Sequence, residues 1–321
     1  MEKSLFYVGE RPCAVWDPEI RKKNLELLKH FDTHYFEYMA NIHSAEVDSE
    51  HTQQAATALR TSYGLALETL FSLLGATLQA PKCVFGWLYQ YKEGDLRLVV
   101  QGISGTRKLR TRFRGQLTWK SLSNTIHRNL LLSDKVKEGE IKAGFATFWD
   151  YSATEYLDLG SRSEFNSMKH GLRFQPGGFR LAFGLQEKRD VPAPPNRMEG
   201  MGGSKFGATT LTLERIGKTR LDYRVREHSR NWDLGSLAGR IRLISMSIHN
   251  VVSCLLILNG QEPSKLQFFS PEDLADFDRA WESNCGTNAC SIGSCITEEN
   301  ICLTTADEVE KSYNFKDKDS A

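Results

Sequence analysis

Residues 50–80, EHTQQAATALRTSYGLALETLFSLLGATLQA, predict one long amphipathic helix, and this helix decides the fold class. Apolar side chains recur along it every three or four residues, which places them on one helical face: Leu59, Tyr63, Ala66, Leu67, Leu70, Phe71, Leu74 and Leu78. Pro81 ends the pattern, because proline cannot continue a helix. Such a face must be covered by other helices, so the segment predicts a helical bundle.

Similar patterns on both sides of this segment predict further helices. Before it, Trp16, Ile20, Leu27 and Phe31 recur at helical spacing after Asp17-Pro18, and the helix is expected to run to about residue 45. After it, helices are expected over 119–132, 141–157 and 237–258, with a short one following Ser270-Pro271. Short polar connections between such helices favour an antiparallel bundle.

The periodicity changes at residues 175–178, QPGG. Apolar and polar residues then alternate over 179–185, 208–214 and 221–226, which is the pattern of half-buried strands. Between the first two strands, residues 190–207 are rich in proline and glycine and predict a long exposed loop. These segments predict a small antiparallel sheet.

The predicted fold class is therefore α+β, a mainly helical bundle with a small antiparallel sheet inserted before the last long helix. The expected division is a helical bundle over 1–175, the sheet with its Pro/Gly loop over 176–230, and helices completing the same unit over 231–283. Residues 284–321 are expected to form an acidic, Cys-bearing flexible tail.

Composition excludes several classes of protein. Of 321 residues, 40% are hydrophobic and 25% charged, which is enough apolar material for a core and argues against general disorder. The apolar run over 248–258 is interrupted by His249, Asn250 and Ser253 and is shorter than the roughly 20 residues that cross a bilayer. The first 18 residues lack the apolar stretch of a secretory signal, so we expect a cytoplasmic protein without a membrane partner.

The near-neutral net charge of +1 is the sum of a basic part and an acidic part of the chain. After Gly260 there are 13 acidic and 5 basic residues, so this part carries −8 and residues 1–260 carry +9. A basic body is compatible with a nucleic-acid partner, and the acidic tail is expected to compete with phosphate for it.

The sequence predicts no metal or cofactor. Four of the seven cysteines lie near the C-terminus, but none forms a Cys-x-x-Cys pair, so free thiols are expected: Cys285, Cys290, Cys295 and Cys302. The metal alternative is the pair His30 and His34, with Glu26 and Glu37 near the same helical face. It lacks the pattern of a zinc protease, and a surface histidine pair is the favoured interpretation.

Residues 161–173, SRSEFNSMKHGLR, form the most informative polar segment. In a helix, Arg162, Asn166, Lys169 and His170 share one stripe near the helix end at Gly171. This combination suits transesterification at a phosphodiester: His170 as general acid and base, Arg162 and Lys169 stabilising the phosphorane, and Asn166 orienting. The alternative is that His170 and Asn166 bond the following loop while the basic residues are solvated.

A helical bundle with such an Asn/Lys/His-bearing helix end resembles the HEPN superfamily, whose members include metal-independent endoribonucleases of toxin and antiviral defence systems. In that family an arginine is followed by histidine after four to six residues. Seven residues separate Arg162 from His170, whereas Arg242 and His249 enclose six and form an alternative catalytic pair, although Leu243 is apolar where the family has a polar residue. The resemblance implies metal-independent RNA cleavage and a homodimer. A core role for His249 among its apolar neighbours is the competing interpretation.

Residues 107–120 contain six basic residues and no acidic one. In an extended chain, Lys108, Arg110, Arg112 and Arg114 would project from one side, which suits a phosphate backbone. Phe113 or Trp119 could stack an unpaired base. The alternative is a solvated loop.

Together these features predict an RNA-directed cytoplasmic protein, a metal-independent HEPN-like endoribonuclease of a toxin or antiviral defence type. The alternative is a non-catalytic interaction or regulatory subunit whose 190–207 loop and acidic tail bind a partner protein. Proximity of residues 107–114 to His170 would unite the two basic segments in one site.

Overall fold

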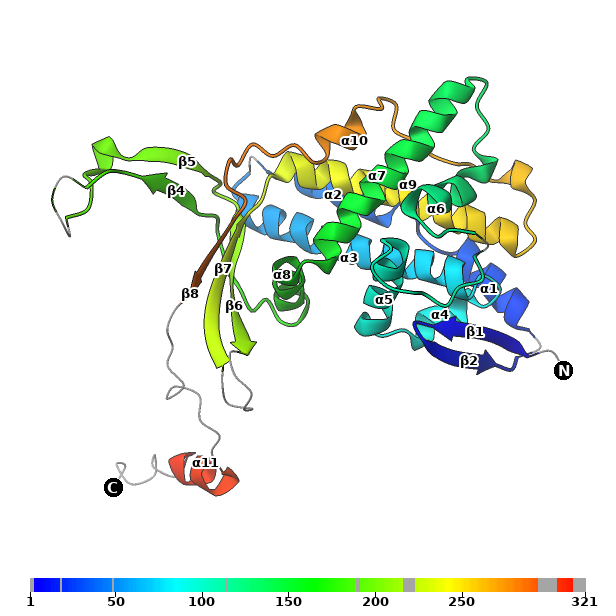
Figure 1. The fold of residues 1–321 in the computed structure, drawn as a ribbon, viewed down its shortest axis with the longest axis horizontal. Helices are drawn as coiled ribbons and strands as arrows, with labels where there is room; N and C mark the ends of the chain where they lie inside the picture. The colour runs from blue at the N-terminus through cyan, green and yellow to red at the C-terminus, as the bar shows by residue number, and fades with distance from the viewer. Residues whose placement is uncertain are drawn as a thin grey trace.

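The computed structural model describes residues 3–17, 19–47, 49–113, 115–186, 188, 191–215, 223–293 and 305–313. The fold is α+β, with a helical bundle and small antiparallel sheets, as predicted. The bundle forms the body in Figure 1, and the strands β4 to β8 lie at the end of it opposite the N-terminus.

Two long helices form the centre of the bundle, α3 (Thr52–Gln79) and α9 (Leu234–Leu258). They pack along each other and bury a continuous apolar core, which includes Leu70 and Phe71 of α3 and Ile244 of α9. The predicted helices over 50–80 and 237–258 are thus confirmed. By length and composition α9 could cross a membrane, but 72% of its most apolar window is buried inside the fold, consistent with a soluble protein.

The helix expected from Asp17 to about residue 45 is wrong in one respect, since it is two helices, α1 (Ile20–Lys29) and α2 (Tyr35–Ala45). The break has a local cause. Asp32 Oδ1 accepts a hydrogen bond from the backbone N–H of His34 at 3.1 Å, an Asx turn that competes with helix continuation.

An N-terminal hairpin and two helices were not predicted: β1 (Ser4–Val8), β2 (Arg11–Val15), α4 (Val84–Gln90) and α5 (Glu93–Ile103). Gln79 at the end of α3 holds the hairpin turn, because its buried amide accepts from Gly9 N at 2.9 Å and donates to Gly9 O at 2.8 Å. Gly9 has φ +61°, a conformation that favours glycine. The hairpin is thereby fixed beside α4 and α5.

The remaining helices are α6 (Trp119–Ile126), α7 (Lys135–Leu157), α8 (Leu159–Lys169), α10 (Asp276–Arg279) and α11 (Ala306–Tyr313). Their starts follow capping rules: Asp134 Oδ1 accepts from Val136 N at 2.9 Å, and Asp158 Oδ2 accepts from Ser161 N at 2.8 Å. Asp158 also closes α7, so a single residue turns the chain from α7 into α8.

The main sheet has the strand order β3-β6-β7-β8, all antiparallel. Its strands are β3 (Gln175–Pro176), β6 (Gly207–Arg215), β7 (Tyr223–Asn231) and β8 (Ala289–Gly293). The β6–β7 pair confirms the strands expected near 208–214 and 221–226. Residues 289–293 were expected in a flexible tail but form β8 instead, because the ladder of β7 offers them backbone partners from Arg226 to Arg230.

A second ribbon, which we call the arm, consists of β4 (Arg180–Phe183), β5 (Glu199–Gly203) and the described residues between them. The arm stands out from the body of the molecule in Figure 1. The expected 190–207 loop is therefore wrong at 199–203, where glycine-rich chain pairs with β4.

Candidate functional site

A groove with basic walls lies where the N-terminal hairpin meets α5. We call it the basic groove; it has a volume of about 610 Å³ and is lined by Arg11, Lys92, Gly94, Asp95, Arg97, Leu98, Gln101 and Arg107. Its residues come from β2, from α5 and its N-cap, and from the segment that follows α5. Three separate parts of the chain thus converge on it.

The charges in the basic groove are unequal, with four cations and one carboxylate among the lining residues. Asp95 Oδ2 pairs with Arg11 at 2.6 Å and also accepts from the Lys92 backbone N–H at 3.0 Å. Arg97 Nε is buried and has no hydrogen-bond partner among the described residues. Arg107 is exposed and lies 3.9 Å from Glu10. Two of the four cations thus have carboxylate partners, and the remaining positive charge of Lys92 and Arg97 makes the groove suitable for an anion.

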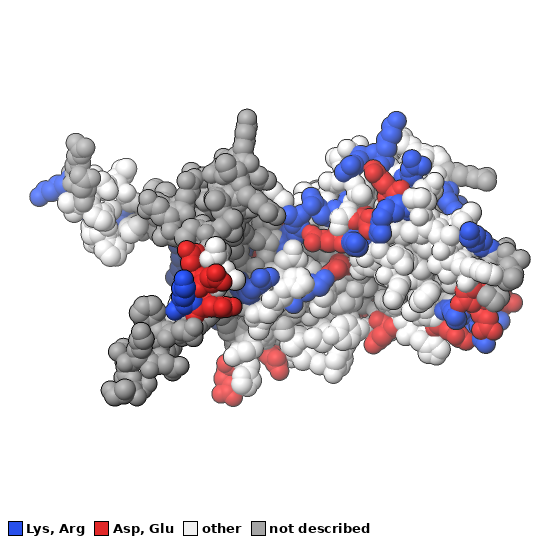
Figure 2. Space-filling view, turned by 90° about the horizontal axis from the view of Figure 1, so that it is seen from below, with Lys and Arg blue, Asp and Glu red and all other residues white. Residues whose placement is uncertain are grey.

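The basic character is local. Figure 2 shows Lys and Arg side chains interspersed with Asp and Glu over the side of the molecule that is seen from below, without one continuous field of either sign. On this side of the molecule, a ligand attracted by positive charge therefore meets small groups of cations and no extended basic surface.

The predicted basic segment runs extended next to this groove. Lys108, Arg110 and Arg112 are exposed, while the residues between them face the protein. The backbone is held by α3, since Thr111 Oγ1 donates to Leu78 O at 2.8 Å and Gln79 Nε2 donates to Arg110 O at 2.7 Å. The three cations therefore lie on one side of a fixed strand-like segment, and Arg114 lies outside the described residues.

Two of these cations also contact β1. The Arg110 guanidinium lies 5.4 Å from the centre of the Tyr7 ring, and Arg112 donates to the Leu5 carbonyl. Both side chains remain exposed, so each can reach a ligand without leaving the hairpin surface.

The aromatic residues expected to stack a base are not free to do so. Trp119 is 6% exposed and its indole N–H donates to Ser104, while Phe113 packs against the core. Two aromatic side chains of α4 are exposed instead, Tyr89 at 78% and Phe85 at 40%, with ring centres 6.2 Å apart and nearly parallel. Sequence reasoning missed this pair on α4, although their i, i+4 spacing was a visible signal.

The Tyr89 and Phe85 pair lies close to the basic groove. Tyr89 directly precedes Gln90, whose carbonyl accepts a hydrogen bond from Arg11 Nη2 at 2.9 Å. Lys92 follows two residues later and lines the groove. Cationic and aromatic surfaces are thus neighbours at the C-terminal end of α4.

The predicted catalytic stripe lies at the end of α8. His170 caps the helix and is exposed. Its basic neighbours are engaged by carboxylates: Lys169 Nζ lies 2.7 Å from Glu68 of α3, and Arg162 Nε lies 3.6 Å from Glu93 of α5. Asn166 contributes its backbone carbonyl to the N–H of His170 at 3.0 Å. The four residues thus lie on or at the end of one helix, but Arg162 and Lys169 pair with carboxylates on two different helices.

Helix α5 connects this stripe to the basic groove. Glu93, Arg97 and Gln101 are spaced by four residues and lie on one helical face. Glu93 contacts Arg162, and the other two line the groove. The charges of this region also act on Tyr156. Burial and the charges of Glu68 and Glu93 raise the pKa of Tyr156, while the charge of Arg97 lowers it. The two basic segments predicted from sequence thus lie at opposite ends of one face of α5, since Arg162 contacts Glu93 in its first turn and Arg107 lines the groove with Gln101 in its last turn.

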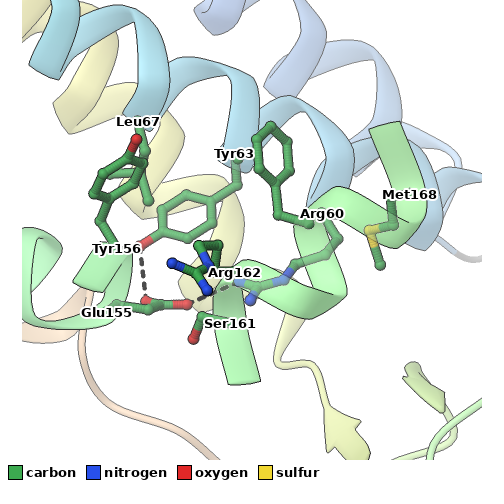
Figure 3. Close-up of a pocket in the computed structure, with 10 residues that line it drawn as sticks. Arg60, Tyr63, Leu67, Glu155, Tyr156, Ser161, Arg162 and Met168 are labelled. Atoms are coloured by element: carbon green, nitrogen blue, oxygen red, sulfur yellow. Dashed lines mark hydrogen bonds and ion pairs between the residues drawn. The ribbon is translucent and has the colours of Figure 1, made fainter. Parts of the chain in front are cut away.

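A buried ionic cluster lies behind α8, and sequence reasoning missed it. Its members are Arg60, Tyr63, Glu155, Glu164, Trp232 and Arg240. Arg60 bridges two glutamates, with Nη1 3.0 Å from Glu155 Oε1 and Nη2 2.6 Å from Glu164 Oε2. In Figure 3, Arg60 and Tyr63 point from α3 toward Glu155. A visible signal was an arginine directly beside Leu59 in the apolar pattern of residues 50–80.

The electrostatics of this cluster indicate a structural role. Burial raises the pKa of Glu155, but the charges of Arg60 and Arg240 outweigh it and hold that pKa at about 2. Burial lowers the pKa of Arg60, but the charges of Glu164 and Glu155 outweigh burial and raise this pKa above its usual value. No proton exchange is expected near neutral pH. The cavity in Figure 3, bounded by Arg60, Tyr156 and Phe165 among others, holds about 40 Å³, room for about one water molecule.

The alternative pair, Arg242 and His249, lies on α9. Arg242 Nε donates to Asn41 Oδ1 at 3.3 Å, and His249 Nδ1 lies 2.9 Å from Thr33 Oγ1. Burial, followed by the charge of His34, lowers the pKa of His249. The imidazole is half-buried and packs against Phe269 with ring centres 4.1 Å apart. His249 is thus engaged with Thr33 and Phe269 at the edge of the core, and it also lines a pocket of about 510 Å³.

The residues weighed for metal binding do not gather in one site among the described residues. His30 Nδ1 bonds the Glu26 carbonyl at 2.8 Å, and His34 lies 3.3 Å from Glu37. Within the described ranges, no group of three or more His, Cys, Asp or Glu side chains is placed to hold a metal ion. Cys285 and Cys290 are free thiols, and Cys295 and Cys302 lie outside the described residues.

Comparison with known proteins gives no match to a family model, a curated protein or a solved structure.

Proposed function

We propose that this chain is an RNA-directed protein that binds the phosphate backbone in the basic groove. The observation that carries the proposal is the unequal charge of the groove, where Lys92 and Arg97 have no carboxylate partner among the described residues. Phosphate oxygens are acceptors that such donors bind well, and they bring the negative charge that the groove lacks. The exposed row of Lys108, Arg110 and Arg112 extends the same surface.

The neighbouring aromatic pair favours unpaired RNA as the ligand. Tyr89 and Phe85 present exposed rings on α4, and Gln90 at the end of this helix accepts a hydrogen bond from Arg11 of the groove. Bases stack on such rings only when they are free of a duplex, while the phosphates follow a basic channel. The proposed ligand is therefore a single-stranded segment of cytoplasmic RNA.

Cleavage of that RNA is a second proposal, favoured by the α5 face that joins the groove to α8. In a HEPN-like, metal-independent reaction, His170 would serve as general acid and base. Arg162 and Lys169 would stabilise the phosphorane, and Asn166 would orient the substrate. Their ion pairs with carboxylates are partly exposed and therefore weak, so a phosphate can displace the carboxylates.

Binding is tested with a fluorescently labelled single-stranded RNA, by anisotropy over a series of salt concentrations. We expect the affinity of the wild-type protein to fall with added salt. Arg97→Ala and Arg107→Ala should each weaken binding and flatten the salt dependence by about 0.7 in log–log slope, the share of one phosphate. Lys265→Ala is the control, because Lys265 is an exposed cation on another part of the surface, paired with Glu262. Salt-independent binding, or equal effects of all three variants, would contradict the proposal.

Cleavage is tested on the same RNA without added metal. We expect His170→Ala to bind as the wild type does and to lose cleavage by about 100-fold or more, the contribution of a general acid or base. Full cleavage by His170→Ala would show that the catalytic assignment is wrong. Intact binding with no cleavage by the wild-type protein would contradict the nuclease proposal and leave the binding proposal standing.

A further inference from the structure

A separate pocket lies between α1, the second half of α9 and residues 261–267, and we call it the α1–α9 pocket. It is the pocket of about 510 Å³ that His249 lines, and this volume lies in the range of small-molecule sites. Helix α1 and the C-terminal end of α9 lie at the end of the molecule opposite the arm (Figure 1). None of the residues that line this pocket also lines the basic groove, so a ligand here and an RNA in the groove occupy different places.

The inner wall of the α1–α9 pocket is apolar. Leu28 of α1 and Val252 and Leu256 of α9 line it, and each is at most 7% exposed. Phe31 and Leu266 also line it and pack against the core as partly buried side chains. Burial of apolar surface against such side chains is favourable, so this wall favours a ligand with an apolar part.

The charged side chains at the α1–α9 pocket are cationic. Lys29 at the end of α1 lines it and has no carboxylate within ion-pair distance among the described residues. Lys265 also lines it and pairs with Glu262 at 2.8 Å, but the two side chains are 62% and 66% exposed, so this pair is weak. Among the described residues, no Asp or Glu lines the pocket. Positive charge beside an apolar wall therefore suits an organic anion.

Neutral polar side chains complete the lining. Gln261, Ser264 and Gln267 line the α1–α9 pocket from the segment that follows α9. Amide N–H and hydroxyl groups donate to carboxylate oxygens, and such bonds to a charged acceptor are stronger than neutral ones. This segment thus offers hydrogen-bond donors for the charged part of the same anion.

The α1–α9 pocket is held in shape by hydrogen bonds from α9 to the segment that closes it. Ser253 Oγ donates to Gln267 O at 3.1 Å. Asn250 Nδ2 donates to Phe269 O at 2.8 Å, and Asn250 Oδ1 accepts from Phe269 N at 2.7 Å. A ligand therefore meets a preformed site, and its binding energy is not spent on ordering this segment.

We propose that the α1–α9 pocket binds a small amphipathic anion, a carboxylate carried by an apolar chain. Lys29 and Lys265 attract the carboxylate, and the wall of Leu28, Val252 and Leu256 covers the chain. The pocket needs both parts of such a ligand. An alcohol of the same length brings no charge to the lysines, and an inorganic anion leaves the apolar wall exposed to water.

The ligand requirement is tested by calorimetric titration of the full-length protein with decanoate, octanoate and decanol. We expect decanoate to bind at one site. Octanoate lacks two methylene groups and should bind about 15-fold more weakly, since each buried methylene contributes about a factor of four. Decanol lacks the charge and should bind about fivefold more weakly than decanoate. Inorganic phosphate at the same concentration as decanoate should not displace it, and displacement would contradict a site that needs the apolar chain.

Two variants separate the charge from the apolar wall. Lys29→Gln should weaken decanoate binding by about fivefold and leave decanol binding unchanged, because only an exposed charge is removed. Val252→Thr should weaken the binding of both ligands by about threefold or more, because a hydroxyl replaces a methyl group of the wall. Lys137→Gln is the matched control, since Lys137 is an exposed lysine of α7 that does not line the pocket. Circular dichroism checks that all three variants are folded.

Histidine ring NMR signals locate the bound ligand. Decanoate should shift the signal of His249, which lines the pocket, and leave that of His170 at the end of α8 unchanged. Three results would each overturn the proposal: no binding of decanoate up to about 1 mM, decanol binding as tightly as decanoate, or equal effects of Lys29→Gln and Lys137→Gln. A shift of the His170 signal in place of the His249 signal would equally contradict it, because the anion would then lie elsewhere.

Discussion

Arg60 Nη2 lies 2.6 Å from Oε2 of Glu164, and the glutamate side chain is only 1% exposed. The same carboxylate accepts from the Trp232 indole N–H at 2.7 Å. This single carboxylate joins α3 to α8 and to the chain between β7 and α9. The position of the α8 stripe relative to the bundle therefore depends on a buried charge pair.

Removal of the Arg60 charge should strongly destabilise the fold. In Arg60→Met, Glu164 and Glu155 lose a buried counter-ion, and we expect the free energy of unfolding to fall by about 3–5 kcal/mol. Urea unfolding at neutral pH measures this. Lys135→Met is the control, since Lys135 is 68% exposed in its pair with Glu138, and should change stability by less than about 1 kcal/mol. Equal effects of the two variants would show that the cluster does not hold the helices.

His127 should make stability depend on pH between about 6.5 and 4. Burial lowers its pKa to about 4, and the ring is stacked on Phe145 with centres 4.6 Å apart. Asn250 Nδ2 donates to Nε2 at 3.1 Å, so the neutral ring carries its proton on Nδ1, which donates to Ser123 O. The unfolded chain binds a proton near pH 6.5 and the native protein does not. Stability is therefore lost as the pH falls, by about 1.4 kcal/mol per unit.

Histidine NMR signals and unfolding curves measure this pH dependence. The His127 ring signal should stay unchanged down to about pH 4. In the variant His127→Gln, the free energy of unfolding should no longer fall in the way that His127 causes between about pH 6.5 and pH 4. A ring that titrates near pH 6.5 in the native state would contradict the buried neutral form.

Two helix glycines should respond in opposite directions to alanine. A Cβ on Gly64 of α3 would lie 2.1 Å from Phe165 Cδ2 of α8, so Gly64→Ala should destabilise by about 1–3 kcal/mol as α8 is displaced. A Cβ on Gly139 of α7 meets nothing within 4 Å, and Gly139→Ala should stabilise by about 0.5–1 kcal/mol. Thermal and urea unfolding check both, and a neutral Gly64→Ala would mean that the α3–α8 contact is looser than described.

The contribution of base stacking on Tyr89 to RNA binding should be separable from the contribution of the cations. Tyr89→Ala should weaken binding of single-stranded RNA by about 1–3 kcal/mol with an unchanged salt slope, because a ring and not a cation is removed. Tyr38→Ala, at a tyrosine 61% exposed on α2, is the matched control and should have no effect. Anisotropy titrations at two salt concentrations decide the matter, and an equal loss for duplex RNA would exclude base stacking at this residue.

The sequence predicted the elements whose signals are local. Residues 50–80 and 237–258 form helices because apolar residues repeat along many turns and Pro81 or Asn259-Gly260 ends them. The break between α1 and α2 was missed, since a single Asx turn at Asp32 outweighs a periodic pattern that continues across it. The short hairpin β1–β2 and the strand β8 were missed because five-residue strands carry little periodicity and depend on partners distant in sequence.

The chain alone thus determined the fold class, the long helices and the presence of two basic segments, since these follow from periodicity, capping and charge. Only the tertiary structure decided which side chains meet. Arg60 finds its partners 95 and 104 residues away, and Arg162 finds Glu93 on α5. These pairings depend on how separate helices pack, and packing sums many weak contacts that no local pattern encodes. The arm is a second example. The alternation of apolar residues predicted its first strand, but only the tertiary structure showed that the bundle does not cover this strand.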